Sequence, residues 1–150
     1  MRKFAFIVLC FITCLSFMAC DKDHDVTEVE IRSYLIGRWY SSHAEAIGNG
    51  RHVVTEITKT GEYAAAYYEL IFKADGTYSF GYWLQDNYGI SRWKEEPGNY
   101  SVKGDIVSLM GPDDETIDFL FDSGQRTLSV RGQTTINGVN VVVNIYLKKY

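Results

Sequence analysis

Short segments of alternating apolar and polar residues fill the chain from Gly37 to its last residue, and residues that favour turns separate them. The turn signals lie at residues 48–50, 60–61, 75–76, 87–89, 97–99, 104–105, 111–113, 123–124 and 137–138. Segments this short suit antiparallel strands joined by hairpins, because parallel strands need long crossover connections. The pattern therefore predicts an all-β chain that folds as an antiparallel barrel or sandwich.

The alternation places large apolar side chains on one face of each predicted strand. These faces are formed by Tyr68, Leu70 and Phe72, by Tyr78, Phe80 and Tyr82, by Ile117, Phe119 and Phe121, and by Val139, Val141, Val143, Ile145 and Leu147. Gly76 provides the positive φ that a hairpin between the first two strands needs. Residues 63–68 contain three alanines that would also suit a helix start. We predict a strand there, because strand-forming residues follow at 69–72.

A short helix is predicted just before the strands, over residues 28–35. Thr27 and Glu30 have the spacing of a capping box, in which each side chain bonds the other's backbone amide. Ile31 and Leu35 share one face of this helix. We therefore expect the helix to cover the strands as a lid or plug.

The N-terminus has the pattern of a signal peptide. Arg2 and Lys3 precede an apolar run over residues 4–18, which is shorter than the roughly 20 residues that a membrane-spanning helix needs. Ala19 followed by Cys20 resembles the lipobox of bacterial lipoproteins. That resemblance implies cleavage after residue 19 and attachment of diacylglycerol, with fatty acids such as palmitate, to Cys20. The alternative is a retained anchor helix.

The expected location follows from this lipobox resemblance. Removal of residues 1–19 would leave Cys20 as the one cysteine of the mature chain, so we expect no disulfide and no thiolate metal cluster. Residues 20–26 form an acidic tether that leads to a domain over residues 27–150. Acidic residues beside the lipidated cysteine resemble a surface-export signal, so we predict the cell envelope, at the outer membrane and exposed on its surface. Inner-membrane retention and a plain solvated tether are the alternatives.

Charge and motifs exclude several functions. The chain of 150 residues has a net charge of −4, which argues against a nucleic-acid partner, because such a protein needs clustered Lys and Arg. The sequence contains no nucleophile elbow, phosphate-binding loop or zincin helix, so we do not predict an enzyme. His43, Glu45 and His52 flank one turn and would form a weak metal site, but we favour surface histidines. No metal or cofactor is predicted.

Four pieces of sequence in a fixed order resemble the small lipocalin-like domains of bacterial lipoproteins. They are Gly-x-Trp at residues 37–39, Phe-x-x-Asp-Gly-Thr-Tyr at 72–78, Gly-x-Tyr-x-Val-x-Gly-Asp at 98–105 and a basic final strand at 144–149. The resemblance covers residues 34–149. It implies an antiparallel up-and-down barrel of about eight strands. In that family Trp39 would close the barrel floor, and Lys148 or Lys149 would lie over it; we favour Lys148.

The predicted function rests on aromatic residues that are expected to point into the barrel. Eight of them are candidate ligand contacts: Tyr68, Phe72, Tyr78, Phe80, Tyr82, Tyr100, Phe119 and Phe121. They form either a filled core or the lining of a cavity, and a cavity above roughly 300 Å³ would favour the lining. We predict a non-catalytic binder of a small, partly apolar or amphipathic ligand. The alternative is a filled barrel that contacts another envelope protein through its loops and an exposed Trp83 or Trp93.

Overall fold

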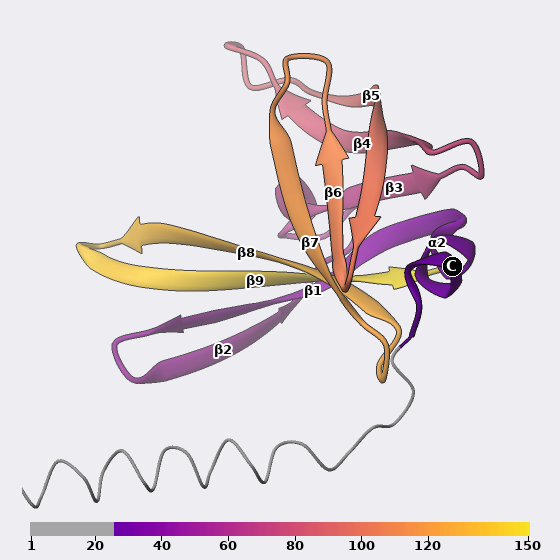
Figure 1. Cartoon of the computed structure of the whole chain (residues 1–150). Helices are drawn as coiled ribbons and strands as arrows, with labels where there is room; N and C mark the ends of the chain where they lie inside the picture. Colours follow the sequence, from indigo (N-terminus) through magenta and orange to yellow (C-terminus); the bar gives the residue numbers. More distant parts are fainter. Residues whose placement is uncertain (1–25) are drawn as a thin grey trace, which may run out of the picture.

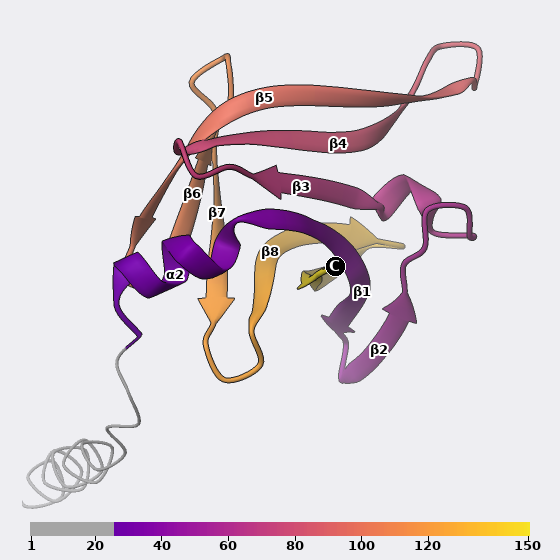
Figure 2. The same cartoon turned by 90° about the vertical axis from the view of Figure 1, so that its right-hand side faces the viewer.

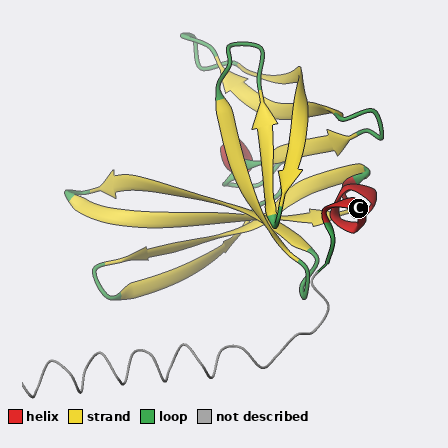
Figure 3. Cartoon of the chain, viewed as in Figure 1, coloured by secondary structure: helices red, strands yellow, loops and turns green. Residues whose placement is uncertain are grey.

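The computed structural model describes residues 26–150, which form one short α-helix, one 3₁₀ turn and nine strands (Figures 1 and 3). The elements are α2 Glu28–Leu35, β1 Gly37–Gly48, β2 Arg51–Glu56, η1 Ala64–Ala66, β3 Tyr68–Phe72, β4 Thr77–Gln85, β5 Ser91–Lys103, β6 Ile106–Met110, β7 Thr116–Asp122, β8 Thr127–Ile136 and β9 Val139–Lys149. The predicted signal peptide, Cys20 and most of the tether lie outside the described residues.

The strands form an antiparallel barrel that closes when β1 pairs with β9. From β3 to β9 each strand pairs with the next along the chain. Strand β1 bends and has two partners on its other edge: Gly37–Tyr40 pair with β3, and His43–Gly48 pair with β2. Eight strands, β1 and β3 to β9, therefore close the barrel, and β2 is an added strand. The predicted all-β, up-and-down barrel of about eight strands with a short helix is confirmed.

The barrel opens widely on one side. Strands β7 and β8 pair only at Leu120–Asp122, whereas β8 and β9 remain paired along the whole of β8. Figure 1 shows the result: the far halves of β8, β9, β1 and β2 run to one side, while β4 to β7 diverge from them. Beyond the base of the barrel, strands β7 and β8 are therefore not paired, and the β4–β7 side separates from the β8–β9 side.

Helix α2 closes the base of the barrel (Figure 2). The capping box is present: the Thr27 amide donates to Glu30 Oε2 at 2.8 Å, and the Glu30 amide donates to Thr27 Oγ1 at 3.3 Å. Ile31 and Leu35 are buried in the core, so the predicted plug is confirmed. Trp39 lies beneath the helix, fully buried, and its indole nitrogen donates to the Leu35 carbonyl at 2.8 Å.

The lysine over the floor is Lys149, and the prediction of Lys148 is wrong. Trp39 pairs with Lys149 across β1 and β9, and paired side chains share a face, so Lys148 points outward and is exposed. The Lys149 ammonium donates to the Tyr34 carbonyl and lies 4.7 Å from the centre of the Tyr34 ring. The Tyr34 ring in turn packs against Trp39, edge to face.

This difference predicts unequal effects of two neighbouring substitutions. Lys149→Met is expected to lower the free energy of unfolding by about 1–2 kcal/mol, because it removes a charged hydrogen bond and a cation–π contact. Lys148→Met, its matched control, should change that free energy by less than about 0.5 kcal/mol. Urea denaturation of both variants measures the difference. Equal effects would show that Lys149 does not hold helix α2 to the barrel.

Two further predictions are corrected by the fold. Within residues 63–68, Ala64–Ala66 form a 3₁₀ turn, and strand β3 begins only at Tyr68. Alanine has little strand preference, and Ser41 Oγ fixes the turn's end by donating to the Ala66 carbonyl and accepting from the Tyr68 amide. Residues 97–99 were predicted as a turn but lie inside β5. Strand β6 pairs with β5 only from Asn99 onward. At Pro97 the edge of β5 that faces β6 therefore has no partner strand, and a proline, which has no N–H to donate, is tolerated there.

Candidate ligand-binding site

A cavity of about 210 Å³ lies at the mouth of the barrel, between β4, β5 and the loop that joins β6 to β7. It is lined by Tyr78, Phe80, Tyr82, Glu96, Leu109, Gly111, Pro112, Asp113, Glu115 and Ile117. A more open hollow of about 450 Å³ adjoins it, and Tyr78, Gly111 and Pro112 line both. The aromatic cavity is smaller than the roughly 300 Å³ expected of a hollow barrel.

Strand alternation places these side chains in the cavity. On β4, Phe80 lies opposite Glu96 of β5, and Tyr78 lies opposite Gly98. Gly98 stands two residues before the buried Tyr100, so Glu96 belongs to the same inward face. A Cβ atom on Gly98 would lie 2.5 Å from the Tyr78 ring and 2.4 Å from the Met110 carbonyl oxygen. The absence of a side chain at Gly98 is therefore what lets the Tyr78 ring lie across β5.

The polar groups of the cavity centre on Glu96. Tyr82 donates its phenol proton to Glu96 Oε1 at 2.8 Å, and this hydrogen bond is the main reason why the pKa of Tyr82 is raised. Lys94 Nζ lies 3.7 Å from the same oxygen. Burial raises the pKa of Tyr78, and the negative charge of Glu96 raises it further. Both phenols therefore stay protonated at neutral pH; the Tyr82 proton is used in the hydrogen bond to Glu96, whereas that of Tyr78 is available to a ligand.

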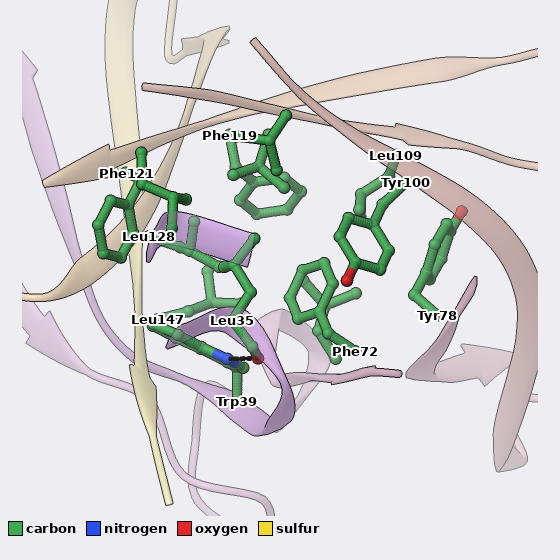
Figure 4. Close-up of a cluster of buried hydrophobic side chains, with 14 residues drawn as sticks. Leu35, Trp39, Phe72, Tyr78, Tyr100, Leu109, Phe119, Phe121, Leu128 and Leu147 are labelled. Atoms are coloured by element: carbon green, nitrogen blue, oxygen red, sulfur yellow. Dashed lines mark hydrogen bonds between the residues drawn. The ribbon is translucent and has the colours of Figure 1, made fainter. Parts of the chain in front are cut away.

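Tyr78 is largely buried, and its side chain lines the cavity. Only 6% of the residue is exposed, yet its hydroxyl makes no hydrogen bond to any of residues 26–150. Its ring lines the cavity, and the hydroxyl points away from the Tyr100 and Phe72 rings (Figure 4). The hydroxyl is therefore accessible from the cavity, where water or a bound molecule can form a hydrogen bond with it.

Four of the eight predicted ligand contacts belong to the filled core instead. Phe72, Tyr100, Phe119 and Phe121 are buried with helix α2 at the base of the barrel (Figure 4). Phe72 and Tyr100 pack edge to face with ring centres 4.9 Å apart. The Tyr100 hydroxyl donates to the Lys73 carbonyl at 3.0 Å, so it needs no ligand. Prediction of these four as ligand contacts is wrong, because the helix fills the space that a ligand would take.

The other four predicted aromatics lie at the mouth. Tyr78, Phe80 and Tyr82 line the cavity, and Tyr68 packs on Phe80 with ring centres 5.4 Å apart. The structure therefore brings half of the predicted set together. Glu96 was missed, although counting back by twos from Tyr100 along one strand would have found it. The predicted turn at 97–99 interrupted that count.

The predicted exposed tryptophans are partly covered. Trp83 and Trp93 lie opposite each other on the outer face of β4 and β5 and pack edge to face at 5.3 Å. The Lys59 ammonium lies 4.2 Å from the centre of a Trp93 ring. The indole nitrogen of Trp83 is buried and has no hydrogen-bond partner among the residues that the structure describes. Neither tryptophan is a freely exposed anchor of the kind that a protein partner would need.

The histidines do not converge. His52 Nε2 lies 3.7 Å from Glu45 Oε2, but the His43 ring stacks on Tyr146 with centres 4.6 Å apart. Tyr146 also donates to Glu45 Oε2 at 3.0 Å. Within residues 26–150 no three His, Cys, Asp or Glu side chains group as metal ligands would. The same part of the chain contains no helix of sufficient length and apolarity to cross a membrane.

Comparisons with known proteins reach the fold level only. No protein-family model and no curated protein matches the sequence. Among solved structures, the chain is similar to the siderocalin Ex-FABP, with 11% identity, a TM-score of 0.40, and coverage of 78% of this chain and 74% of that one. It is also similar to lobster apocrustacyanin A1, with 9% identity, a TM-score of 0.39, and coverage of 80% and 63%. The barrel assignment rests on the chain's own strand pairing.

Proposed function

We propose that this protein binds a small, partly apolar molecule in the cavity at the barrel mouth and performs no chemistry on it. The observation that carries the proposal is the aromatic cavity, onto which the Tyr78 hydroxyl opens without a hydrogen bond to any of residues 26–150. Rings of Phe80 and Tyr82 supply apolar area, and the hydroxyl and Glu96 supply orientation. A few polar groups in a largely apolar hollow are typical of small-molecule sites.

The size of the cavity limits the ligand. About 210 Å³ is below the roughly 300–1,000 Å³ of pockets for drug-sized molecules. The filled base, with Phe72 and Tyr100 packed against helix α2, prevents deeper entry. The ligand is therefore about the size of a single ring system with a short substituent, held between the rings of β4 and the β6–β7 loop.

The ligand proposal predicts that a double variant, Phe80→Ala with Tyr82→Ala, loses its co-purifying molecule. Removing both rings takes away most of the aromatic wall of the cavity. Native mass spectrometry of full-length protein purified from envelopes compares the bound mass in wild type and variant. Tyr88→Ala is the control, because Tyr88 is 89% exposed and lies outside the cavity. Wild-type protein without any bound molecule, or an equally occupied double variant, would contradict the proposal.

We further propose that the domain is a lipoprotein of the cell envelope, anchored through diacylglycerol and palmitate on Cys20. The apolar run before Ala19-Cys20 and the charged residues after it support this assignment. Several acyl chains give stable attachment, since each buried methylene contributes about 0.8 kcal/mol. The acidic residues after Cys20 favour the outer membrane and surface exposure. Helix α2 begins at Glu28, eight residues after the proposed anchor at Cys20.

A further inference from the structure

The charges around the mouth cavity are mostly of one sign. Glu96 lies on its strand wall, and Asp113 and Glu115 lie on its loop wall. No Lys or Arg is among the residues that line it within the described part of the chain. Lys94 stands beside the cavity, with its ammonium 3.7 Å from Glu96. The lining therefore contains three acidic residues and no basic one, with one lysine beside it, so its net charge is negative.

We infer that the molecule held in this cavity is an organic cation: a small amine with a ring or a short apolar body. The inference rests on the proposed function and specifies its ligand class. An anion of the same size would lie near three acidic residues with no basic residue in the lining to balance its charge, and like charges in one site repel each other.

Glu96 has an oxygen available for such an ammonium group. Its Oε1 accepts the Tyr82 phenol at 2.8 Å and is the atom nearest to Lys94. Its Oε2 makes no hydrogen bond to the described residues. The pair with Lys94 is largely solvent-exposed, with 51% and 42% of the two side chains accessible. Exposed ion pairs of this kind contribute little, so Lys94 does not block an ammonium that also contacts the rings.

The aromatic groups next to Glu96 suit a cation as well. Phe80 and Tyr82 are stacked with ring centres 5.3 Å apart and an angle of 27° between their planes. The face of an aromatic ring attracts a cation within about 6 Å, most strongly where water is excluded. The partner-free Tyr78 hydroxyl has lone pairs that accept an N–H bond. A carboxylate, aromatic rings and a hydroxyl acceptor therefore occur together at one hollow.

Three probes that share an indole ring test the charge of the ligand. Tryptamine is a cation at neutral pH, tryptophol is neutral and indole-3-propionate is an anion. We expect tryptamine to bind the full-length protein about tenfold more tightly than tryptophol, and indole-3-propionate to bind most weakly. Isothermal titration calorimetry at low ionic strength measures the three affinities. A neutral or anionic probe that binds as tightly as tryptamine would overturn the inference and leave the proposed function standing.

The Glu96→Gln variant tests whether Glu96 causes the preference for the cationic probe. It keeps the shape of the side chain and an acceptor for Tyr82, and it should abolish the preference, so that tryptamine binds no more tightly than tryptophol. Glu95→Gln is the matched control, because Glu95 is the adjacent residue of β5 and its carboxylate bonds Trp93 instead. A double change of Asp113→Asn and Glu115→Gln, on the loop, should weaken tryptamine binding two- to threefold.

The possible failures are distinguishable. If Glu96→Gln retains the full preference for tryptamine, the cation is held elsewhere and the inference is wrong. If none of the three probes binds to the wild type but native mass spectrometry detects an anionic or neutral molecule that is lost with Phe80 and Tyr82, only the ligand class is wrong. If no probe binds and no molecule co-purifies, the proposed function fails together with the inference.

Discussion

Replacing Trp39 with alanine is expected to lower the free energy of unfolding by about 3–5 kcal/mol, the range for removing a large aromatic side chain from a core. Trp39 is 0% exposed and is the largest side chain of the buried cluster. It contacts Tyr34 edge to face, with ring centres 5.9 Å apart, and its indole nitrogen bonds the Leu35 carbonyl. Its loss would leave a cavity between helix α2 and the barrel floor. Since domains of this size are stabilised by about 5–15 kcal/mol, much of the stability would be lost.

Urea denaturation followed by far-ultraviolet circular dichroism measures this loss. Trp39→Phe separates the two contributions: it keeps most of the volume but leaves the Leu35 carbonyl without its donor, at a cost of about 1–3 kcal/mol. Val29→Ala is the control, because Val29 lies on the same helix and is 74% exposed. If Trp39→Ala loses no more stability than Val29→Ala, the floor of the barrel does not depend on this residue.

Cys20→Ala is expected to abolish lipid attachment completely, because the thiol is the atom that accepts diacylglycerol in the proposed pathway. The uncleaved chain would keep residues 1–19, incorporate no labelled palmitate and migrate as a larger precursor. Labelling of cells with palmitate, followed by mass spectrometry of the purified protein, measures both results. The expected effect is all or none, unlike the graded loss at Trp39.

Cys14→Ala provides the matched control for this experiment. Cys14 lies within the segment proposed to be removed, six residues before Cys20. That variant should be cleaved and labelled like the wild type. Normal processing and palmitate incorporation in Cys20→Ala would refute the lipoprotein proposal. The barrel and its cavity, which residues 26–150 build by themselves, would be unaffected by that outcome.

Local patterns were sufficient to predict the class of fold. Alternation along β3, β4 and β9 identifies strands because each side chain's face depends only on its own position in the strand. The capping box of Thr27 and Glu30 is equally local, since its hydrogen bonds join residues three apart. Helix α2 and an antiparallel barrel or sandwich were therefore predictable from local patterns, and the resemblance to lipocalin-like domains favoured the barrel. The 3₁₀ turn at Ala64–Ala66 was not, because its end is fixed by Ser41, which is distant in sequence.

The candidate site was predictable only in part, for a related reason. Alternation identifies the residues that point into a barrel, but it does not tell how deep along the barrel each one lies. Tyr100 and Tyr82 look alike in sequence, yet one is covered by the helix plug and the other stands at the mouth. Glu96 became part of the site because β5 continues through Pro97 and Gly98.

By itself, the sequence determined that the chain forms paired strands, which side chains point inward and where the capped helix begins. These are properties of neighbouring residues, set by backbone geometry and short-range hydrogen bonds. Only the tertiary structure decided which inward residues fill the core, which line the cavity and that Lys149 covers the floor. Those outcomes depend on cross-strand register and on where helix α2 docks, and both are fixed by contacts between residues far apart in the chain.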